Sequence, residues 1–256
     1  MEQSGNSLEA DPRPLSARSV MASLLLGRSP SRAGGRDLVR WCGLFGIAPG
    51  TARVALHRMV AAGELVRDGA AYELAGRLAT RGREQEESLA PRTRAWRGRW
   101  RMAVVTGEGR PAGERAALRD ALRRARLAEW REGVWLRPDN LPGLVEDPRC
   151  AWVDARPEHD PARLAARLFH PGAWSARAGV LRERIARSTY RLDAGDASGI
   201  AQAFVVAADA LRHVRADPLL PRVLLPDGWP GRALRVAYQE YQRSFDAVAR
   251  AWFRAG

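Results

Sequence analysis

Three observations in the sequence predict an α+β protein. Residues 16–79 hold helical patterns and then two short β-capable runs around an Asp-Gly turn. Residues 100–170 alternate strand and helix patterns, and residues 171–256 are helical apart from one proline-rich stretch. Between the first two parts, residues 80–99 have the composition of a charged linker, and residues 1–15, which are polar and contain Gly and Pro, are expected to be a disordered tail.

Two helices are expected before residue 46. Ser16 can cap a helix that runs to about Gly27, because a serine hydroxyl can accept a hydrogen bond from a free N–H of the first turn. Residues 28–35 are rich in Ser, Gly and Pro and are interpreted as a connector. A second helix is predicted over residues 37–45, where apolar side chains recur at helical spacing.

Residues 47–74 carry the pattern of a third helix followed by a hairpin. Pro49 suits the first helical position, and Gly63 can end the helix. Two short β-capable runs then flank Asp68-Gly69, a dipeptide typical of hairpin turns. Helix, stop and hairpin are the layout of a winged helix-turn-helix, in which the third helix enters the major groove and the wing touches the phosphate backbone.

The polar side of this third helix carries side chains suited to nucleic acid. Guanidinium and imidazole groups can contact base edges and phosphates. A plain amphipathic helix with a solvated basic side would show the same pattern, but the wing and the two upstream helices favour DNA binding. The expected DNA-binding residues are Gly50, Thr51, Arg53, Val54, His57, Arg58 and Arg67.

The composition favours an anionic partner. The 256 residues are 46% hydrophobic and 28% charged, with a formal net charge of +13 and a pI near 11.2. A balance this basic is typical of proteins that bind nucleic acid, membrane surfaces or polyanionic ligands. The sequence contains no Lys, so all 42 residues of the Lys and Arg count are Arg. Together with abundant Ala and Gly, this indicates a GC-rich genome. Part of the charge therefore reflects codon usage.

Patterns of catalytic and metal sites are missing from the sequence. Cys42 and Cys150 are far apart and form no Cys-x-x-Cys, which argues against a zinc knuckle or a redox dithiol. The four histidines stand at no metal-ligand spacing, and Ser198 misses the Gly-x-Ser-x-Gly pattern by one residue. We therefore expect no enzyme, no metal and no cofactor. Because no apolar signal core or membrane-spanning run is present, a soluble, cytoplasmic protein is expected.

The middle part is predicted to be a ferredoxin-like, split βαβ domain. Strand patterns near residues 100–106, 128–131, 134–137 and 150–155 surround a helix over residues 114–127. The Arg-rich end of the preceding linker contains Trp96, and Arg and aromatic side chains can stack on bases. An RNA-binding or RNA-processing protein that uses this domain and linker is therefore the alternative function, although charge runs are usually solvated.

The last part is predicted to hold helices over residues 174–190, 199–215 and 232–253. The final helix carries an apolar face for another helix or another subunit. Four prolines make residues 217–231 rigid, so Trp229 is expected to be structural. The alternative is that Trp174, His213 and Trp229 line an effector pocket between domains, where such pockets often lie.

Two segments resemble one family. They are Trp96-Arg-Gly-Arg-Trp-Arg-Met-Ala-Val-Val, followed by Gly133-Val-Trp-Leu-Arg-Pro138, and Asp217-Pro-Leu-Leu-Pro-Arg-Val-Leu-Leu-Pro-Asp-Gly-Trp-Pro-Gly231. With the winged helix in front, the chain resembles the PaaX family of bacterial transcriptional repressors of phenylacetic acid catabolism. This resemblance runs from about Ala17 to Phe253.

The resemblance implies a function and partners. It implies a homodimer on a palindromic operator of double-stranded DNA, released by an aryl-CoA or acyl-CoA thioester such as phenylacetyl-CoA. The family's recognition helix corresponds to residues 49–62, and its arginines to Arg53 and Arg58. Ala48 departs from the usual capping Asn or Ser. The middle domain also resembles a small CRISPR-associated nuclease, but Thr106 stands where that enzyme has its metal-binding Asp, so no nuclease activity is expected.

Overall fold

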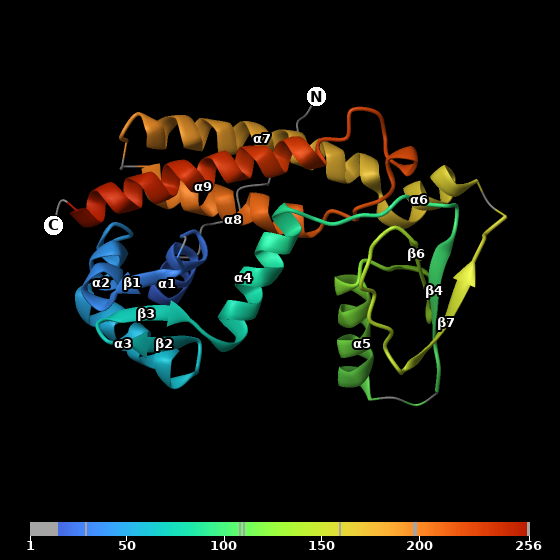
Figure 1. The fold of residues 1–256 in the computed structure, drawn as a ribbon, viewed down its shortest axis with the longest axis horizontal. Helices are drawn as coiled ribbons and strands as arrows, with labels where there is room; N and C mark the ends of the chain where they lie inside the picture. Colours follow the sequence, from blue (N-terminus) through green and yellow to red (C-terminus); the bar gives the residue numbers. More distant parts are fainter. Residues whose placement is uncertain are drawn as a thin grey trace, which may run out of the picture. The chain divides into compact units, whose positions relative to one another are not determined.

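The computed structural model describes residues 15–28, 30–107, 109, 111–158, 160–196 and 199–254. It has a mixed α+β fold with two antiparallel sheets, as the sequence predicts (Figure 1). The helices are α1 (Ala17–Leu26), α2 (Gly35–Gly43), α3 (Pro49–Ala61), α4 (Gly76–Leu89), α5 (Ala112–Arg124), α6 (Pro161–Phe169), α7 (Pro171–Asp193), α8 (Ile200–Arg215), the 3-10 helix η2 (Arg222–Leu224) and α9 (Gly231–Arg254). The strands are β1 (Arg32–Gly34), β2 (Leu65–Asp68), β3 (Ala71–Leu74), β4 (Trp100–Val105), β5 (Ala128–Arg131), β6 (Val134–Pro138) and β7 (Cys150–Ala155).

The chain forms two compact units, and each is assembled from segments that are distant in sequence. The first unit comprises Met1–Glu86, Arg184–Ala208 and Tyr238–Gly256, and the second comprises Glu87–Glu183 and Asp209–Ala237. Helices α4, α7, α8 and α9 contribute residues to both units. The sequence suggested consecutive domains instead, and those domain boundaries stay predictions.

The first unit contains α1, α2, α3 and a sheet of order β1-β3-β2. Ser16 caps α1 as expected, because its hydroxyl accepts a hydrogen bond from the Ser19 backbone N–H at 3.2 Å. The interpretation of residues 28–35 as a connector is wrong in part, since Arg32–Gly34 forms strand β1 and pairs antiparallel with β3. Pairing with a distant partner makes this strand, and local composition carries no sign of it.

An aromatic cluster joins α2 to the end of α9 within the first unit. The Trp41 ring is fully buried and lies 5.5 Å from Phe245 and 5.6 Å from Trp252, measured between ring centroids. Phe45, just after α2, lies 5.6 Å from Phe204 of α8. The apolar face predicted for the last helix therefore packs, at its C-terminal end, on another helix of the same chain. Burial of several aromatic rings makes this contact a major source of stability for the unit.

The charged linker predicted over residues 80–99 is wrong in its first half, because α4 continues to Leu89. Leu78 and Gln85 are buried, and they are two helical turns apart. A single row of buried side chains along one face is enough to stabilise a helix that is otherwise mostly charged. The run of charged residues therefore concealed an amphipathic helix.

The second unit holds a sheet of order β5-β6-β4-β7 in which all neighbours are antiparallel. On one face, Ala103 and Trp135 pack against Leu118 and Leu122 of α5. On the other face, a second cluster contains Trp100 and Leu136 of the sheet, Leu164 and Ala165 of α6, and Leu220 and Leu224. Successive residues of β4 point to opposite faces, so both sides of this sheet are covered.

The proline-rich segment is fixed by buried polar contacts in the second unit. The Asp217 carboxylate accepts a hydrogen bond from the Leu219 backbone N–H at 2.9 Å and pairs with Arg235 of α9 at 2.8 Å. A Cβ at Gly231 would lie 2.5 Å from Trp229 and 2.8 Å from Asp217, so no larger residue fits there without a shift. These contacts favour the structural interpretation of this segment.

Among the described helices, none has the length and apolar character needed to cross a membrane.

Candidate nucleic-acid interface

Helix α3 separates a buried side from an exposed side. Ala52, Leu56 and Met59 are at most 7% exposed and face the core formed with α1 and α2. On the other side Val54 is 52% exposed. The predicted DNA-binding positions of this helix are all exposed: Gly50, Thr51, Arg53, Val54, His57 and Arg58. The helix therefore presents these residues together, and their contact with DNA stays a prediction.

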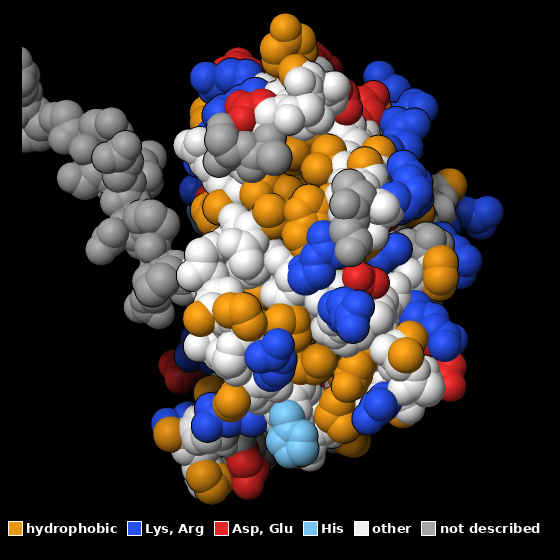
Figure 2. Space-filling view, turned by 90° about the vertical axis from the view of Figure 1, so that its left-hand side faces the viewer, with side chains coloured by type: hydrophobic (Ala, Val, Ile, Leu, Met, Phe, Trp, Pro, Cys, Tyr) orange, Lys and Arg blue, Asp and Glu red, His pale blue; other side chains and the backbone are white. Residues whose placement is uncertain are grey.

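Unpaired basic groups lie on this exposed side. In the described part of the chain, Arg53, His57 and Arg58 make no ion pair or side-chain hydrogen bond. Arg53 and His57 are four residues apart and so are neighbours on the helix surface. Basic side chains are distributed over the face shown in Figure 2, with hydrophobic side chains between them. Charge alone therefore does not locate a binding site, and the lack of ion pairs on α3 is the more specific signal.

The N-terminus of α3 leaves backbone donors open. Ala48 is extended, with φ −59° and ψ 143°, and gives no side-chain cap. The first intrahelical bond runs from the Ala52 N–H to the Ala48 carbonyl at 3.0 Å. The N–H groups of Gly50 and Thr51 precede that bond and have no intrahelical acceptor. Such donors at a helix N-terminus are suited to bind a phosphate.

The hairpin β2–β3 follows α3 and carries Arg67. Gly69 takes a positive φ of 60° in the turn, as the Asp-Gly pattern predicts. The Arg67 side chain is exposed, and its Nε donates to the Gly69 carbonyl at 2.8 Å. Arg32 of β1 pairs with Asp68 at 2.8 Å and with Glu73 at 3.0 Å. Arg32 is thus neutralised within the sheet, and Arg67 is the free cation of this hairpin among the described residues.

An ion pair ties α1 to the chain just after α3. Arg18 Nε donates to Glu64 at 2.8 Å. This hydrogen bond from Arg18 holds the pKa of the Glu64 carboxyl below its ordinary value. Both groups are near the surface, so the pair contributes little to overall stability. It does help to fix the orientation of α1 against the α3–β2 junction.

Two family models match this chain. One, described as PaaX-like protein, matches residues 16–78, and the other, described as PaaX-like protein C-terminal domain, matches residues 180–255. The chain belongs to the PaaX-like protein family. A solved structure, titled "Uncharacterized protein Rv0674 from Mycobacterium tuberculosis", is 43% identical to this PaaX-like chain, covers 92% of it and 98% of its own length, and has a TM-score of 0.77. No curated protein matches the sequence significantly.

Family membership is consistent with a transcriptional regulator. The first PaaX-like match ends at residue 78, just after the hairpin. It therefore contains the whole of the candidate interface. The second match contains the end of α7 together with α8 and α9.

The Arg-rich run that suggested RNA binding is largely paired. Arg94 pairs with Asp139, and Arg101 pairs with Asp154 at 2.5 Å. The Trp96 Nε1 donates to the Arg99 carbonyl at 2.6 Å, and its ring packs against the core of the second unit. These side chains are therefore occupied with contacts inside the protein.

Thr106 also has a structural partner. Its hydroxyl donates to the Arg149 carbonyl at 3.1 Å. In the described ranges, no group of three His, Cys, Asp or Glu side chains could hold a metal ion.

The three residues expected to line an effector pocket do lie together. The Trp174 ring stacks on His213 and on Trp229, with centroid distances of 4.4 Å in both cases. The His213 Nε2 donates to the Trp174 carbonyl at 2.9 Å. Both faces of the Trp174 ring are therefore covered by protein. A role in effector binding stays a prediction for these residues.

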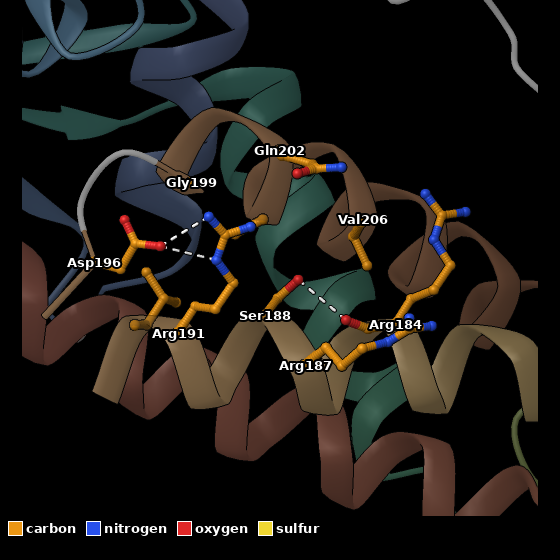
Figure 3. Close-up of a pocket in the computed structure, with 10 residues that line it drawn as sticks. Arg184, Arg187, Ser188, Arg191, Asp196, Gly199, Gln202 and Val206 are labelled. Atoms are coloured by element: carbon orange, nitrogen blue, oxygen red, sulfur yellow. Dashed lines mark hydrogen bonds and ion pairs between the residues drawn. The ribbon is translucent and has the colours of Figure 1, made fainter. Parts of the chain in front are cut away.

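A cavity that the sequence did not indicate lies between the end of α7 and the start of α8 (Figure 3). Its volume is about 310 Å³, and Arg184, Arg187 and Arg191 line it from α7. Among 42 basic residues these three do not stand out. Their spacing of three and then four residues on one helix was the signal that could have found them.

Proposed function

We propose that this PaaX-like protein is a transcriptional repressor that reads double-stranded DNA with α3. The observation that carries the proposal is the exposed side of α3, where Arg53, His57 and Arg58 are unpaired and the first turn of the same helix has open backbone donors. Arginine suits guanine edges and phosphates, and the exposed Val54 offers an apolar contact for a thymine methyl group. Arg67 on the hairpin would contact the phosphate backbone.

The arrangement of elements supports a winged helix and a ferredoxin-like domain. Three helices followed by a hairpin, with β1 added beside β3, fit the winged helix. In the second unit, α5 links β4 to β5, and β6 pairs between these two strands. That placement is the one expected of a split βαβ unit.

The proposed regulation follows the family resemblance. A homodimer would place two copies of α3 about 34–36 Å apart, one turn of DNA, and so would select a palindromic operator. An acyl-CoA or aryl-CoA effector would release the operator by binding more tightly to a dimer geometry that does not fit DNA.

A titration with matched variants tests this proposal. The DNA upstream of the gene and of the neighbouring operon would be compared with random duplex by fluorescence anisotropy at fixed salt. We expect preferential binding to one upstream sequence. Arg53→Ala should weaken that binding by about 1–3 kcal/mol, the usual worth of a good base contact. Arg163→Ala removes the same charge from α6 and should leave specific binding nearly unchanged.

Equal affinity for operator and random duplex would contradict the repressor proposal. The RNA alternative makes a different prediction, namely that neutralising Arg92 and Arg97 abolishes RNA binding while Arg53→Ala has no effect. The ion pairs of Arg94 and Arg101 give that alternative less support.

A further inference from the structure

The cavity between α7 and α8 belongs wholly to the first unit. Its floor is the last part of α7, and its opposite wall is the first part of α8 (Figure 3). A volume of about 310 Å³ is at the lower end of the range for small-molecule sites, about 300–1,000 Å³. The cavity therefore suits a small ligand or one portion of a larger ligand.

Charged side chains, most of them arginines, line the walls of this cavity. Arg184, Arg187 and Arg191 line it, and Asp196 is its one acidic residue in the described part of the chain. Arg191 donates from Nε to Asp196 at 2.9 Å, and its Nη2 lies 2.7 Å from the same carboxylate. Arg184 has no ion pair among the described residues. Arg191 is thus paired at the cavity wall, whereas the Arg184 guanidinium has no carboxylate partner among the described residues and is available to an anion.

The start of α8 is shaped around the Arg191 guanidinium. A Cβ at Gly199 would lie 3.0 Å from Arg191 Cζ and 3.1 Å from its Nη2. The guanidinium is therefore packed directly over the backbone where α8 begins. The N-terminal end of a helix carries partial positive charge, which α8 contributes at the same place. Arginine forks and helix N-termini are both groups that bind phosphate well.

Apolar side chains complete the lining. Leu192, Ala203 and Val206 border the cavity, and the Gln202 amide can donate or accept a hydrogen bond. A bare inorganic ion would leave this apolar surface in contact with water. The lining therefore fits a ligand with an anionic group attached to an organic body.

We propose that this cavity binds the phosphate group of a small organic ligand. Arg184 and Arg191 hold the phosphate oxygens together with the first N–H groups of α8. Val206 and Leu192 contact the organic portion. The site is separate from the stacked rings of Trp174, His213 and Trp229, which have no residue in the cavity lining.

The cavity has a direct connection to the candidate DNA-binding helices. Phe204 follows the lining residue Ala203 on α8, and its ring packs edge-on against Phe45, which directly follows α2. Helix α2 in turn contacts α3. A ligand that shifts α8 would therefore act on the elements that hold α3. This regulatory consequence rests on the proposed function, whereas ligand binding itself does not.

Isothermal titration calorimetry on the full-length protein tests the site directly. Pyrophosphate, ATP and coenzyme A are the probes, with sulfate as the anion control at constant ionic strength. They distinguish a site for a diphosphate alone from sites that need a nucleoside or the longer pantetheine arm. We expect at least one phosphorylated probe to bind clearly more tightly than sulfate.

Three variants separate a built site from general charge attraction. Arg184→Gln/Arg191→Gln should weaken binding by about tenfold or more, because charge-assisted hydrogen bonds are lost. Arg177→Gln/Arg182→Gln removes the same charge from α7 outside the cavity and should have little effect. Gly199→Ala keeps the charge but displaces the Arg191 guanidinium, so it should also weaken binding. Thermal unfolding of each variant shows whether it is folded.

The proposal is overturned if no probe binds better than sulfate, or if both arginine double variants lose binding equally. An unchanged affinity in a folded Gly199→Ala variant would remove Arg191 and the α8 N-terminus from the site. DNA titrations with the same proteins keep the two proposals distinguishable. Normal operator binding without phosphate binding would contradict this inference alone. Phosphate binding without operator binding would contradict the proposed function alone.

Discussion

At the scale of single residues, the buried pair of Arg235 and Asp217 should be essential for stability. Their side chains are 9% and 1% exposed, and the Arg235 Nε also donates to the Ser88 carbonyl at 2.9 Å. Arg235→Leu leaves a buried carboxylate without its cation, which should cost about 3–5 kcal/mol of unfolding free energy. Arg232→Leu, at an exposed position of the same helix, should change it by only about 0.5 kcal/mol. Urea unfolding measures both, and similar losses would contradict the assigned role.

The His213 imidazole should make stability depend on pH. Burial lowers the pKa of His213 below its ordinary value of 6.5, and Arg177 lowers it further, while the hydrogen bond to Trp174 and the charge of Asp217 oppose the shift. Below pH 6.5 the unfolded chain therefore binds a proton more readily than the folded one. The stabilisation is complete above that pH and is lost as the pH falls through the folded pKa.

The measurement compares wild type with His213→Gln. The unfolding free energy of the wild type should fall more steeply between pH 7 and pH 5 than that of the variant. Parallel curves would mean that another group causes the acid sensitivity.

At the scale of elements, α3 can be stabilised at its start. Ala48 has the extended backbone of a cap residue but supplies no hydrogen bond. Ala48→Ser should raise the unfolding free energy by about 0.5–1 kcal/mol, because its hydroxyl can accept from an open N–H. Ala70→Ser, at an exposed position of the hairpin turn, is the control. No gain in chemical denaturation would show that these donors already have a partner.

The sequence predicted the elements whose signals are local. The helix expected over residues 49–62 is α3, and the expected strand over residues 150–155 is β7. Proline, glycine and apolar periodicity act within a few residues of where they stand, so they can be read directly. Strand β1 forms because it pairs with β3, and the few buried positions of α4 are hidden among many charged residues in the sequence. Both elements depend on contacts with distant segments, which local patterns do not report.

The candidate site divides in the same way. The exposed side of α3 follows from helical spacing, so all six of its expected residues are exposed together. The cavity needs α7 and α8 side by side, and no spacing within one segment reports that Gly199 lies under Arg191. The tertiary arrangement alone brings these residues together.

At the scale of the whole molecule, the N-terminal segment should not be stable alone. Trp41 packs against Phe245 and Trp252, and Phe45 packs against Phe204, all of which lie more than 150 residues further along the chain. A fragment of residues 1–90 would expose these rings and should show fast amide hydrogen exchange and easy proteolysis compared with the full chain. Full-length-like protection in the fragment would mean that the aromatic cluster contributes little.

The same three-segment construction of the first unit has a consequence for biosynthesis. The residues of α2 that contact the end of α9 are far from it in sequence. A chain emerges from the ribosome N-terminus first, so α2 is made long before α9. Until α9 has emerged, Trp41 of α2 lacks the aromatic partners that complete its core. The core of the first unit can therefore close only after α9 has been translated, and a transcript cut short upstream of α9 should yield a protein whose candidate DNA-binding helix lacks this support.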